Sequence, residues 1–304
     1  MIRGESAFVV NSQGLRLWTE RFGDPDGPVL LLIMGTSAQA NGWPDELVEI
    51  LVNSGNHVIR FDHRDTGQSD FVDFAVAPYT MADMAGDALA VLDGHHVTAA
   101  HIAGASLGGR IAQLLAVHHP DRVRTLTLIM TSPMGHDGGP AIRRAMTGQP
   151  PEPGDLPAPS PEFLQHVTAM ASAPPATREE RVAAAMETWR ITNGTERPFD
   201  AAAARRNVED SLVRARNFQA ADQHDLASRQ MIPERKAPLS RIAAPTLVIH
   251  GTADPLLPFP HGEAVASQIP GSRLSPVPGM GHGFFSAGLP GEIASLIADH
   301  IRCA

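Results

Sequence analysis

The sequence predicts an α/β fold with a mostly parallel central sheet, helices on its faces and an inserted helical cap. Three observations lead to this prediction. Short apolar runs alternate with helical patterns over the first third of the chain. A Gly- and Pro-rich stretch then leads into Ala- and Arg-rich helices without β-branched runs, and strand character returns near residue 245. Strands that alternate with helices form βαβ units, whose strands pair in parallel.

The first section of the core is expected over residues 1–133. Apolar runs predict strands at 29–33, 57–61, 100–103 and 125–130, and amphipathic patterns predict helices at 45–53 and 81–92. A further helix follows Ser106, because Ile111, Leu114 and Leu115 recur at helical spacing before Pro120 ends the pattern.

The cap is expected over residues 134–236. Residues 135–161 are rich in Gly and Pro, and helical patterns fill most of the remainder. The core resumes at 237–304, where an apolar run at 245–249, a second run after Arg273 and a pattern at 292–301 predict two strands and a helix. The sequence therefore predicts one core, formed by 1–133 and 237–304, that a single cap interrupts.

Charge excludes a nucleic-acid binder. The 304-residue chain has a formal net charge of -9 and a pI near 5.8, and its basic residues are scattered. Binding to nucleic acids needs clustered Lys and Arg that displace phosphate counterions. We therefore expect a small molecule as the partner, and nothing in the sequence indicates an oligomeric state.

Cysteine usage and hydropathy indicate a cytoplasmic protein. Cys303 is the only cysteine, so neither an intrachain disulfide nor a thiolate metal cluster can form. Residues 1–5 lack the charged start and apolar stretch of a secretory signal, and no apolar run reaches about 20 residues. The 14 histidines include no H-E-x-x-H motif and no set with ligand spacing, so we expect no metal.

The strongest chemical signal is a match to the G-x-S-x-G pattern of a nucleophile elbow, at Gly104-Ala105-Ser106-Leu107-Gly108. A predicted strand precedes the motif and a helix follows it, which is the context that presents a serine hydroxyl at the carboxyl edge of a sheet. The alternative is a small-residue turn with an incidental serine. The flanking strand and helix favour Ser106 as a nucleophile.

A base and an orienting acid are expected later in the chain, in the order Ser, Asp, His. Asp254 follows the strand predicted at 245–249, although an Asp-Pro pair is also common in turns. His282 lies between glycines after the last predicted strand, and a side chain that titrates near neutrality suits a general base. We therefore predict a triad of Ser106, Asp254 and His282.

Two backbone N–H groups are expected to form an oxyanion hole. Leu107, the residue after the nucleophile, supplies the first. Thr36 lies just past the strand at 29–33, in Met34-Gly35-Thr36, and is placed to supply the second. An ordinary glycine turn after a strand is the alternative.

With these residues in this order, the chain resembles the α/β-hydrolase superfamily over nearly its full length. Closer features are similar to the aclacinomycin methylesterase group of antibiotic-tailoring esterases: Gly42-Trp43-Pro44, Arg60-Phe61-Asp62-His63-Arg64-Asp65-Thr66-Gly67-Gln68-Ser69, Met280-Gly281-His282, Trp189-Arg190-Ile191 and Pro198-Phe199-Asp200. The resemblance implies removal of methyl from a carbomethoxy ester on an anthracycline aglycone, without a cofactor. It implies the same triad, and oxyanion donors at Thr36 and Leu107.

Two positions depart from the superfamily pattern. Met34 replaces the histidine that usually follows the first central strand. Because the oxyanion donor is a backbone N–H, this change leaves the hole in place and alters the wall of the pocket. Asp65 replaces the usual glycine in the turn at 62–69, which we interpret as structural.

The sequence thus predicts a serine carboxylic-ester hydrolase that forms an acyl-enzyme, and the specific form of this activity that we consider is a methylesterase acting on a polyketide-like or other hydrophobic ester. The same triad also serves C–C bond and lactone hydrolases and perhydrolases, and a receptor can keep this fold without turnover. Ser106 excludes an aspartate nucleophile. Residues at helical spacing are more often core than pocket. The candidate pocket residues are Met34, Trp189, Met170, Met186 and Phe218.

Overall fold

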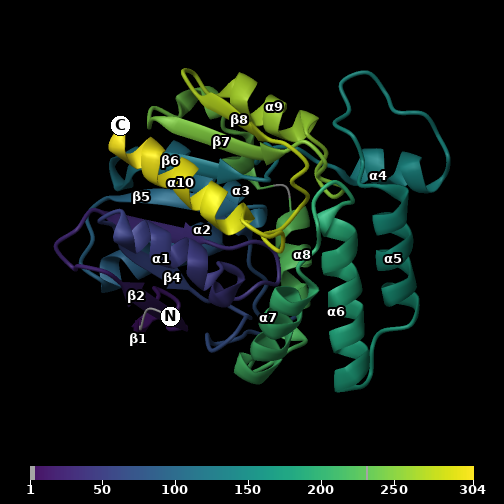
Figure 1. Ribbon diagram of the computed structural model, residues 1–304, viewed down its shortest axis with the longest axis horizontal. Helices are drawn as coiled ribbons and strands as arrows, with labels where there is room; N and C mark the ends of the chain where they lie inside the picture. Colours follow the sequence, from purple (N-terminus) through teal and green to yellow (C-terminus); the bar gives the residue numbers. More distant parts are fainter. Residues whose placement is uncertain (1–3, 231) are drawn as a thin grey trace.

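A mostly parallel sheet forms the centre of the molecule. The computed structural model describes residues 4–230 and 232–304 (Figure 1). Residues 1–3, which belong to the N-terminus expected to lack a secretory signal, and residue 231, within the expected cap, lie outside the described residues. The sheet has eight strands in the order β1-β2-β4-β3-β5-β6-β7-β8. Their bounds are β1 Glu5–Val10, β2 Arg16–Phe22, β3 Val29–Ile33, β4 His57–Phe61, β5 Ala100–Ala105, β6 Val123–Ile129, β7 Thr246–Gly251 and β8 Arg273–Val277.

The first two strands form an antiparallel edge that the sequence patterns did not reveal. β1 pairs with β2, and β2 pairs antiparallel with β4, whereas the pairs from β4 to β8 are parallel. The residues of β1 are mostly exposed or half-buried, and β2 contains the charged residues Arg16, Glu20 and Arg21. A strand with one solvated face lacks the continuous apolar run that marks a buried parallel strand.

Helices cover both faces of the sheet, and successive residues of one strand serve opposite faces. Leu30 and Leu32 of β3 pack in the cluster formed with α1 (Asp45–Asn53) and α10 (Leu289–Arg302). Leu31 and Ile33 pack in the other cluster. That cluster includes α2 (Met81–Gly94), α3 (Leu107–His118) and α9 (Pro260–Gln268). The predicted α/β fold, with helices flanking a mostly parallel sheet, is confirmed.

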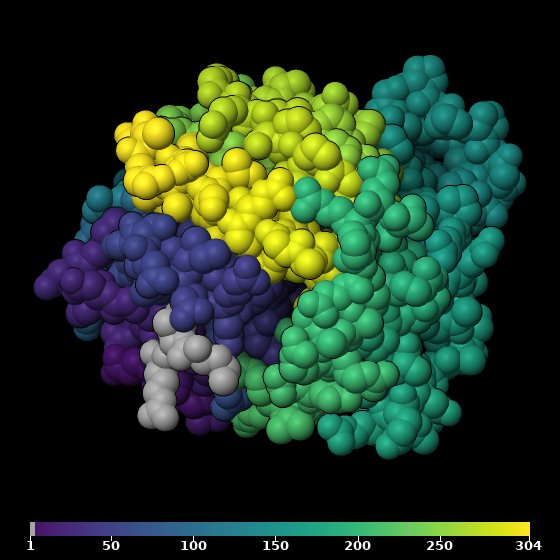
Figure 2. Space-filling view, viewed as in Figure 1, coloured from purple at the N-terminus to yellow at the C-terminus, as the bar shows by residue number. Residues whose placement is uncertain are grey.

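The segment between β6 and β7 is helical and lies along one side of the core (Figures 1 and 2). Its helices are α4 Gly139–Met146, α5 Pro161–Ser172, α6 Arg178–Asn193, α7 Ala201–Arg214 and α8 Gln223–Arg229. Three of them begin at a side-chain oxygen that accepts a first-turn N–H group, from Ser160, Thr177 and Asp200. Short 3-10 turns lie at Ala40–Gly42, Pro120–Arg122, Ala220–Asp222, Pro233–Lys236 and Leu239–Arg241.

Polar contacts join the later part of this helical segment to the core. Arg214 of α7 donates to the buried carboxylate of Asp62 at 2.8 Å, and its guanidinium lies 4.2 Å from the ring centroid of Trp18. Asn207 of the same helix donates to the carbonyl of Asn41 at 2.7 Å. Among the described helices, none is both long and apolar enough to cross a membrane.

Buried neutral histidines predict acid sensitivity of the fold. Burial lowers the pKa of His224 to about 3 and the pKa values of His101 and His261 to about 4. In the unfolded chain each ring takes up a proton near pH 6.5. The unfolded state therefore binds more protons between pH 6.5 and 4, and the free energy of unfolding falls as the pH is lowered through this window.

We expect the free energy of unfolding to be at least about 2 kcal/mol smaller at pH 5 than at pH 7.5, as measured by urea denaturation. His101→Gln removes one of the titrating rings, so its stability should depend less steeply on pH than that of the original chain. Equal stability of the original chain at the two pH values would contradict this prediction.

Candidate active site

The nucleophile elbow is a strained turn between β5 and α3. Ser106 has φ 54° and ψ −117°, a conformation that non-glycine residues rarely adopt. The two glycines of the motif are required by close packing. A Cβ on Gly104 would lie 2.3 Å from the carbonyl oxygen of Gly108, and a Cβ on Gly108 would lie 2.1 Å from that of Ile33. The turn is also anchored from β6, since the N–H of Ser106 donates to the carbonyl of Ile129 at 2.9 Å.

The structure brings the three predicted triad residues together. Ser106 follows β5, Asp254 follows β7 and His282 follows β8, so all three lie at the carboxyl ends of parallel strands. His282 Nε2 is 3.0 Å from Ser106 Oγ, and His282 Nδ1 is 2.7 Å from Asp254 Oδ2. Because an ionised carboxylate only accepts, Nδ1 carries the proton and Nε2 is free to accept one from the serine.

The orientation of the Asp254 carboxylate is fixed on its other side. Its Oδ1 atom accepts the backbone N–H groups of Leu256 and Leu257 at 2.9 and 2.8 Å. Oδ2 is therefore left for His282. His250 Nε2 lies 3.6 Å from the same Oδ2 but donates to the carbonyl of Leu257 at 2.7 Å, and burial lowers the pKa of His250.

The His282 loop is held against the end of α6. The N–H of His282 donates to the carbonyl of Thr192 at 2.6 Å. A Cβ on Gly281 would lie 2.3 Å from the carbonyl oxygens of both Thr192 and Asn193, so only glycine fits there. The glycines beside His282 are visible in the sequence. The contribution of Thr192 is not, because no local pattern links two residues 90 positions apart.

One predicted oxyanion donor directly follows the serine, and the other follows a residue that packs against the serine. Leu107 is the first residue of α3, and Thr36 follows Gly35, where a Cβ would lie 3.2 Å from the Cβ of Ser106. Over residues 4–230 and 232–304, neither the Thr36 nor the Leu107 N–H donates a hydrogen bond to another protein group. Two free backbone donors beside the predicted nucleophile are the arrangement that would stabilise a tetrahedral oxyanion.

The candidate pocket residues are spread over the core and the helical segment. Met34 is 6% exposed and packs in the cluster on the α1 and α10 face. The ring of Trp189 packs edge-on against Phe285 at 4.7 Å between centroids, and would lie 3.3 Å from a Cβ on Gly283, the residue after His282. Met170 on α5 and Met186 on α6 are partly buried. Phe218 is 41% exposed, beneath the guanidinium of Arg181.

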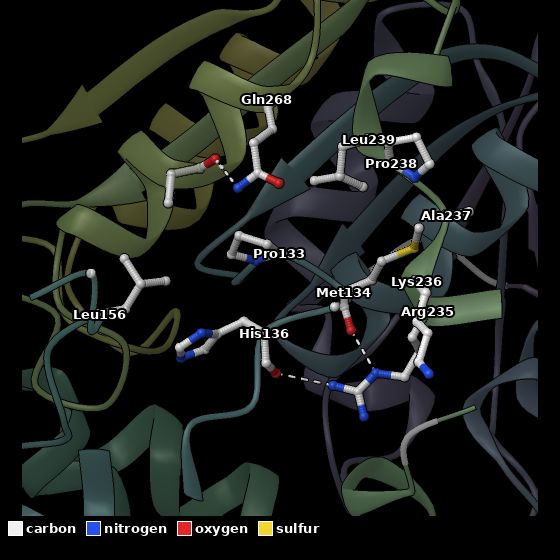
Figure 3. A pocket seen from close by; sticks show the side chains of 13 residues that line it. Pro133, Met134, His136, Leu156, Arg235, Lys236, Ala237, Pro238, Leu239 and Gln268 are labelled. Carbon is white, nitrogen blue, oxygen red and sulfur yellow. Dashed lines mark hydrogen bonds between the residues drawn. The ribbon is translucent and has the colours of Figure 1, made fainter. Parts of the chain in front are cut away.

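Of these candidates, Met34 lies two residues before Thr36, and Trp189 lies beside Gly283, the residue after His282. A separate cavity of about 470 Å³ lies between α9, the loop after β6 and the 3-10 turn at Pro233–Lys236 (Figure 3). It is lined by His136 and Arg235 among others, and no triad residue lines it. Arg235 donates there to the carbonyls of Met134 and His136, so its guanidinium is already engaged by the protein.

The chain is similar to known hydrolases and esterases over most of its length. Residues 28–288 match the family model described as alpha/beta hydrolase fold. Rhodomycin D methylesterase DnrP from Streptomyces peucetius is 41% identical over 97% of this chain and 98% of its own length. Rhodomycin D methylesterase DauP from Streptomyces sp. (strain C5) is 39% identical over the same shares. An esterase from Exiguobacterium antarcticum superimposes with a TM-score of 0.75 at 21% identity, covering 98% of this chain and 100% of that one.

Proposed function

We propose that this chain, which belongs to the alpha/beta hydrolase fold family and is an ester hydrolase, removes methyl from the methyl ester of a polyketide-like hydrophobic acid. The observation that carries the proposal is the continuous hydrogen-bonded line from Ser106 Oγ through His282 to Asp254. Two methylesterases that match the chain over nearly its full length support the choice of bond and substrate class.

In the proposed acylation step, His282 Nε2 takes the proton of Ser106 as Oγ attacks the ester carbonyl carbon. Asp254 keeps the proton on Nδ1 and stabilises the imidazolium that forms. The N–H groups of Thr36 and Leu107 donate to the oxyanion of the tetrahedral intermediate. When the carbon–oxygen bond to the alcohol breaks, His282 returns its proton to the departing methoxy oxygen, and methanol leaves.

Deacylation follows the same path with water as the nucleophile. His282 removes a proton from water, the hydroxide oxygen attacks the acyl carbonyl, and the proton then returns to Ser106 Oγ as the carboxylic acid is released. Every proton is exchanged among Ser106, His282, water and the substrate. The proposed reaction therefore needs no cofactor.

We assign recognition of the acid portion to the helical segment at 134–236, which we propose to be the cap. Its helix α6 brings Trp189 beside Gly283 and Phe285, next to the proposed base. An aromatic side chain at that place offers a flat apolar surface to a ring system. Burial of a large apolar acid against such side chains supplies binding energy that a short-chain ester cannot obtain.

The substrate class is tested with methyl esters that differ only in the acid. We expect kcat/KM for methanol release from a fused-ring aromatic polyketide methyl ester to exceed that for methyl butyrate by about 100-fold or more, since roughly 3 kcal/mol of apolar burial is added. Equal kcat/KM values for the two esters would contradict the polyketide-like substrate. Cleavage of a lactone or a vinylogous diketone without methanol release would favour the other chemistries of this triad.

Labelling separates an enzyme from a receptor of the same fold. A small serine-directed fluorophosphonate should attach to Ser106 in a 1:1 ratio, as read by mass spectrometry of the digested protein. Prior incubation with the polyketide ester should slow the labelling. Absence of label in a chain that binds the ester tightly would identify a non-catalytic receptor.

A further inference from the structure

The loop that carries the proposed oxyanion donor is held in an unfavourable backbone conformation. Ser37 has φ 59°, in the left-handed region that non-glycine residues seldom occupy. Such a residue persists where surrounding contacts hold it. Thr36, the preceding residue, carries the proposed donor N–H, and Gly35 packs closely against Ser106. The conformation of Ser37 therefore affects the position of the proposed oxyanion donor.

The contacts that hold Ser37 come from the helical segment, almost 190 residues later in the chain. The N–H of Ser37 donates to His224 Nδ1 at 3.0 Å, and its hydroxyl donates to the carbonyl of Ala221 at 2.8 Å. His224 lies on α8 and is fully buried. Its Nε2 is 2.8 Å from the carbonyl oxygen of Arg64.

These partners determine the protonation state of His224. The Ser37 N–H can only donate, so Nδ1 must present a lone pair. The Arg64 carbonyl can only accept, so Nε2 must carry the hydrogen. One neutral tautomer satisfies both bonds, and the neutral ring also agrees with burial that lowers the pKa of His224 to about 3.

A second buried histidine holds the other end of the loop. His63 Nε2 is 2.8 Å from the carbonyl oxygen of Met34, to which it donates. The rings of His63 and His224 contact edge-on, with their centroids 5.6 Å apart. His63 thus fixes the peptide plane between Met34 and Gly35, and His224 fixes the plane between Thr36 and Ser37. The plane that carries the Thr36 N–H lies between these two.

We propose that His224 is a positioning residue for ester hydrolysis, which acts through Ser37 to hold the Thr36 N–H in the oxyanion hole. This proposal rests on the proposed function. It makes the helical segment a contributor to transition-state stabilisation as well as to substrate binding. The contribution of His224 is then expected in kcat, because an oxyanion forms only after the substrate is bound.

The test compares two substitutions of similar size. His224→Asn keeps an oxygen that accepts the Ser37 N–H, near the place of Nδ1, whereas His224→Leu fills the space without an acceptor. With a short-chain p-nitrophenyl ester, we expect kcat to fall about 10-fold to 100-fold in the Leu variant with KM changed less than threefold. We expect the Asn variant to retain at least about a third of the original kcat.

His101→Leu is the matched control for the loss of a buried histidine. His101 lies at the other end of β5 from Ser106 and bonds to Thr125 Oγ1 at 2.9 Å, so its removal should lower stability and leave kcat unchanged. If the Leu variant at position 224 does not fold, His224→Ala replaces it in the same comparison with Asn.

The outcomes separate this proposal from the proposed function. An unchanged kcat in the variant without an acceptor, or equal losses of kcat in the Asn and Leu variants, would overturn the positioning role. Those results would leave intact the fluorophosphonate labelling of Ser106 and the methanol release of the original chain. Absence of labelling and turnover in the original chain would instead overturn the proposed function itself.

Discussion

Replacing Ser106 with alanine will lower kcat/KM for ester hydrolysis by about 10⁴-fold to 10⁶-fold and will leave the fold intact. In the proposed mechanism, the substitution removes the only atom of the triad that forms a bond to the substrate carbon. The remaining oxyanion donors and the binding surface accelerate the direct attack of water only modestly. The Ser106 hydroxyl bonds to His282, and alanine keeps the Cβ and the backbone hydrogen bonds of the turn, so stability should change little.

The measurement is kcat/KM of the purified variant with the preferred methyl ester, together with a thermal unfolding curve. We expect the unfolding midpoint to stay within about 1.5 °C of the original value, which for a chain of this length corresponds to about 1 kcal/mol. Fluorophosphonate titration of the same sample guards against a contaminating esterase, since the variant should take up no label. Turnover above one percent of the original rate without label would remove Ser106 from the mechanism.

The parts of the site that the sequence predicted are those with local signals. Ser106 lies in a motif whose glycines close packing requires, and it joins a fully buried strand to a helix. The elbow can therefore be recognised from a few consecutive residues of the sequence. Asp254 and His282 follow apolar strands in the expected order. The resemblance to α/β hydrolases and the prediction of an ester hydrolase are both confirmed by the family match and the methylesterase relatives.

What the sequence did not reveal depends on contacts between distant positions. His224 was not singled out among 14 histidines, because its partner Ser37 lies almost 190 residues earlier and neither belongs to a motif. Thr192, which holds the His282 loop, gives no local signal for the same reason. The strands β1 and β2 were not predicted for another reason, because charged and exposed residues interrupt their apolar pattern.

One departure from the superfamily pattern has a physical explanation in the structure. Asp65, at a position where glycine is usual, has φ 69°. Aspartate tolerates this region better than most residues. Its carboxylate also accepts the N–H of Val72 at 2.8 Å and the hydroxyl of Tyr79 at 2.6 Å. These two bonds stabilise the turn without glycine, in agreement with the structural role predicted for it.

Replacing Asp254 with asparagine will lower kcat by about 10³-fold to 10⁴-fold, although the two side chains have the same shape. The reason lies in the orientation that the surrounding backbone imposes. The N–H groups of Leu256 and Leu257 both need an acceptor, so the asparagine oxygen must take the place of Oδ1. Its NH2 group then faces His282 Nδ1, where the carboxylate oxygen was 2.7 Å away.

An NH2 group in that position selects the wrong tautomer of the base. Nδ1 must accept from the amide, so the proton moves to Nε2 and points at Ser106 Oγ, where no lone pair remains to remove the serine proton. Asp254→Ala, which imposes no tautomer, should therefore lose no more activity than the asparagine variant, despite the greater structural change. We would measure kcat of both variants between pH 6 and 10. At the alkaline end of this range, hydroxide can partly replace the base. An asparagine variant that retained a tenth of the original kcat at pH 7.5 would contradict this account, because its base would then be working without the carboxylate that orients it.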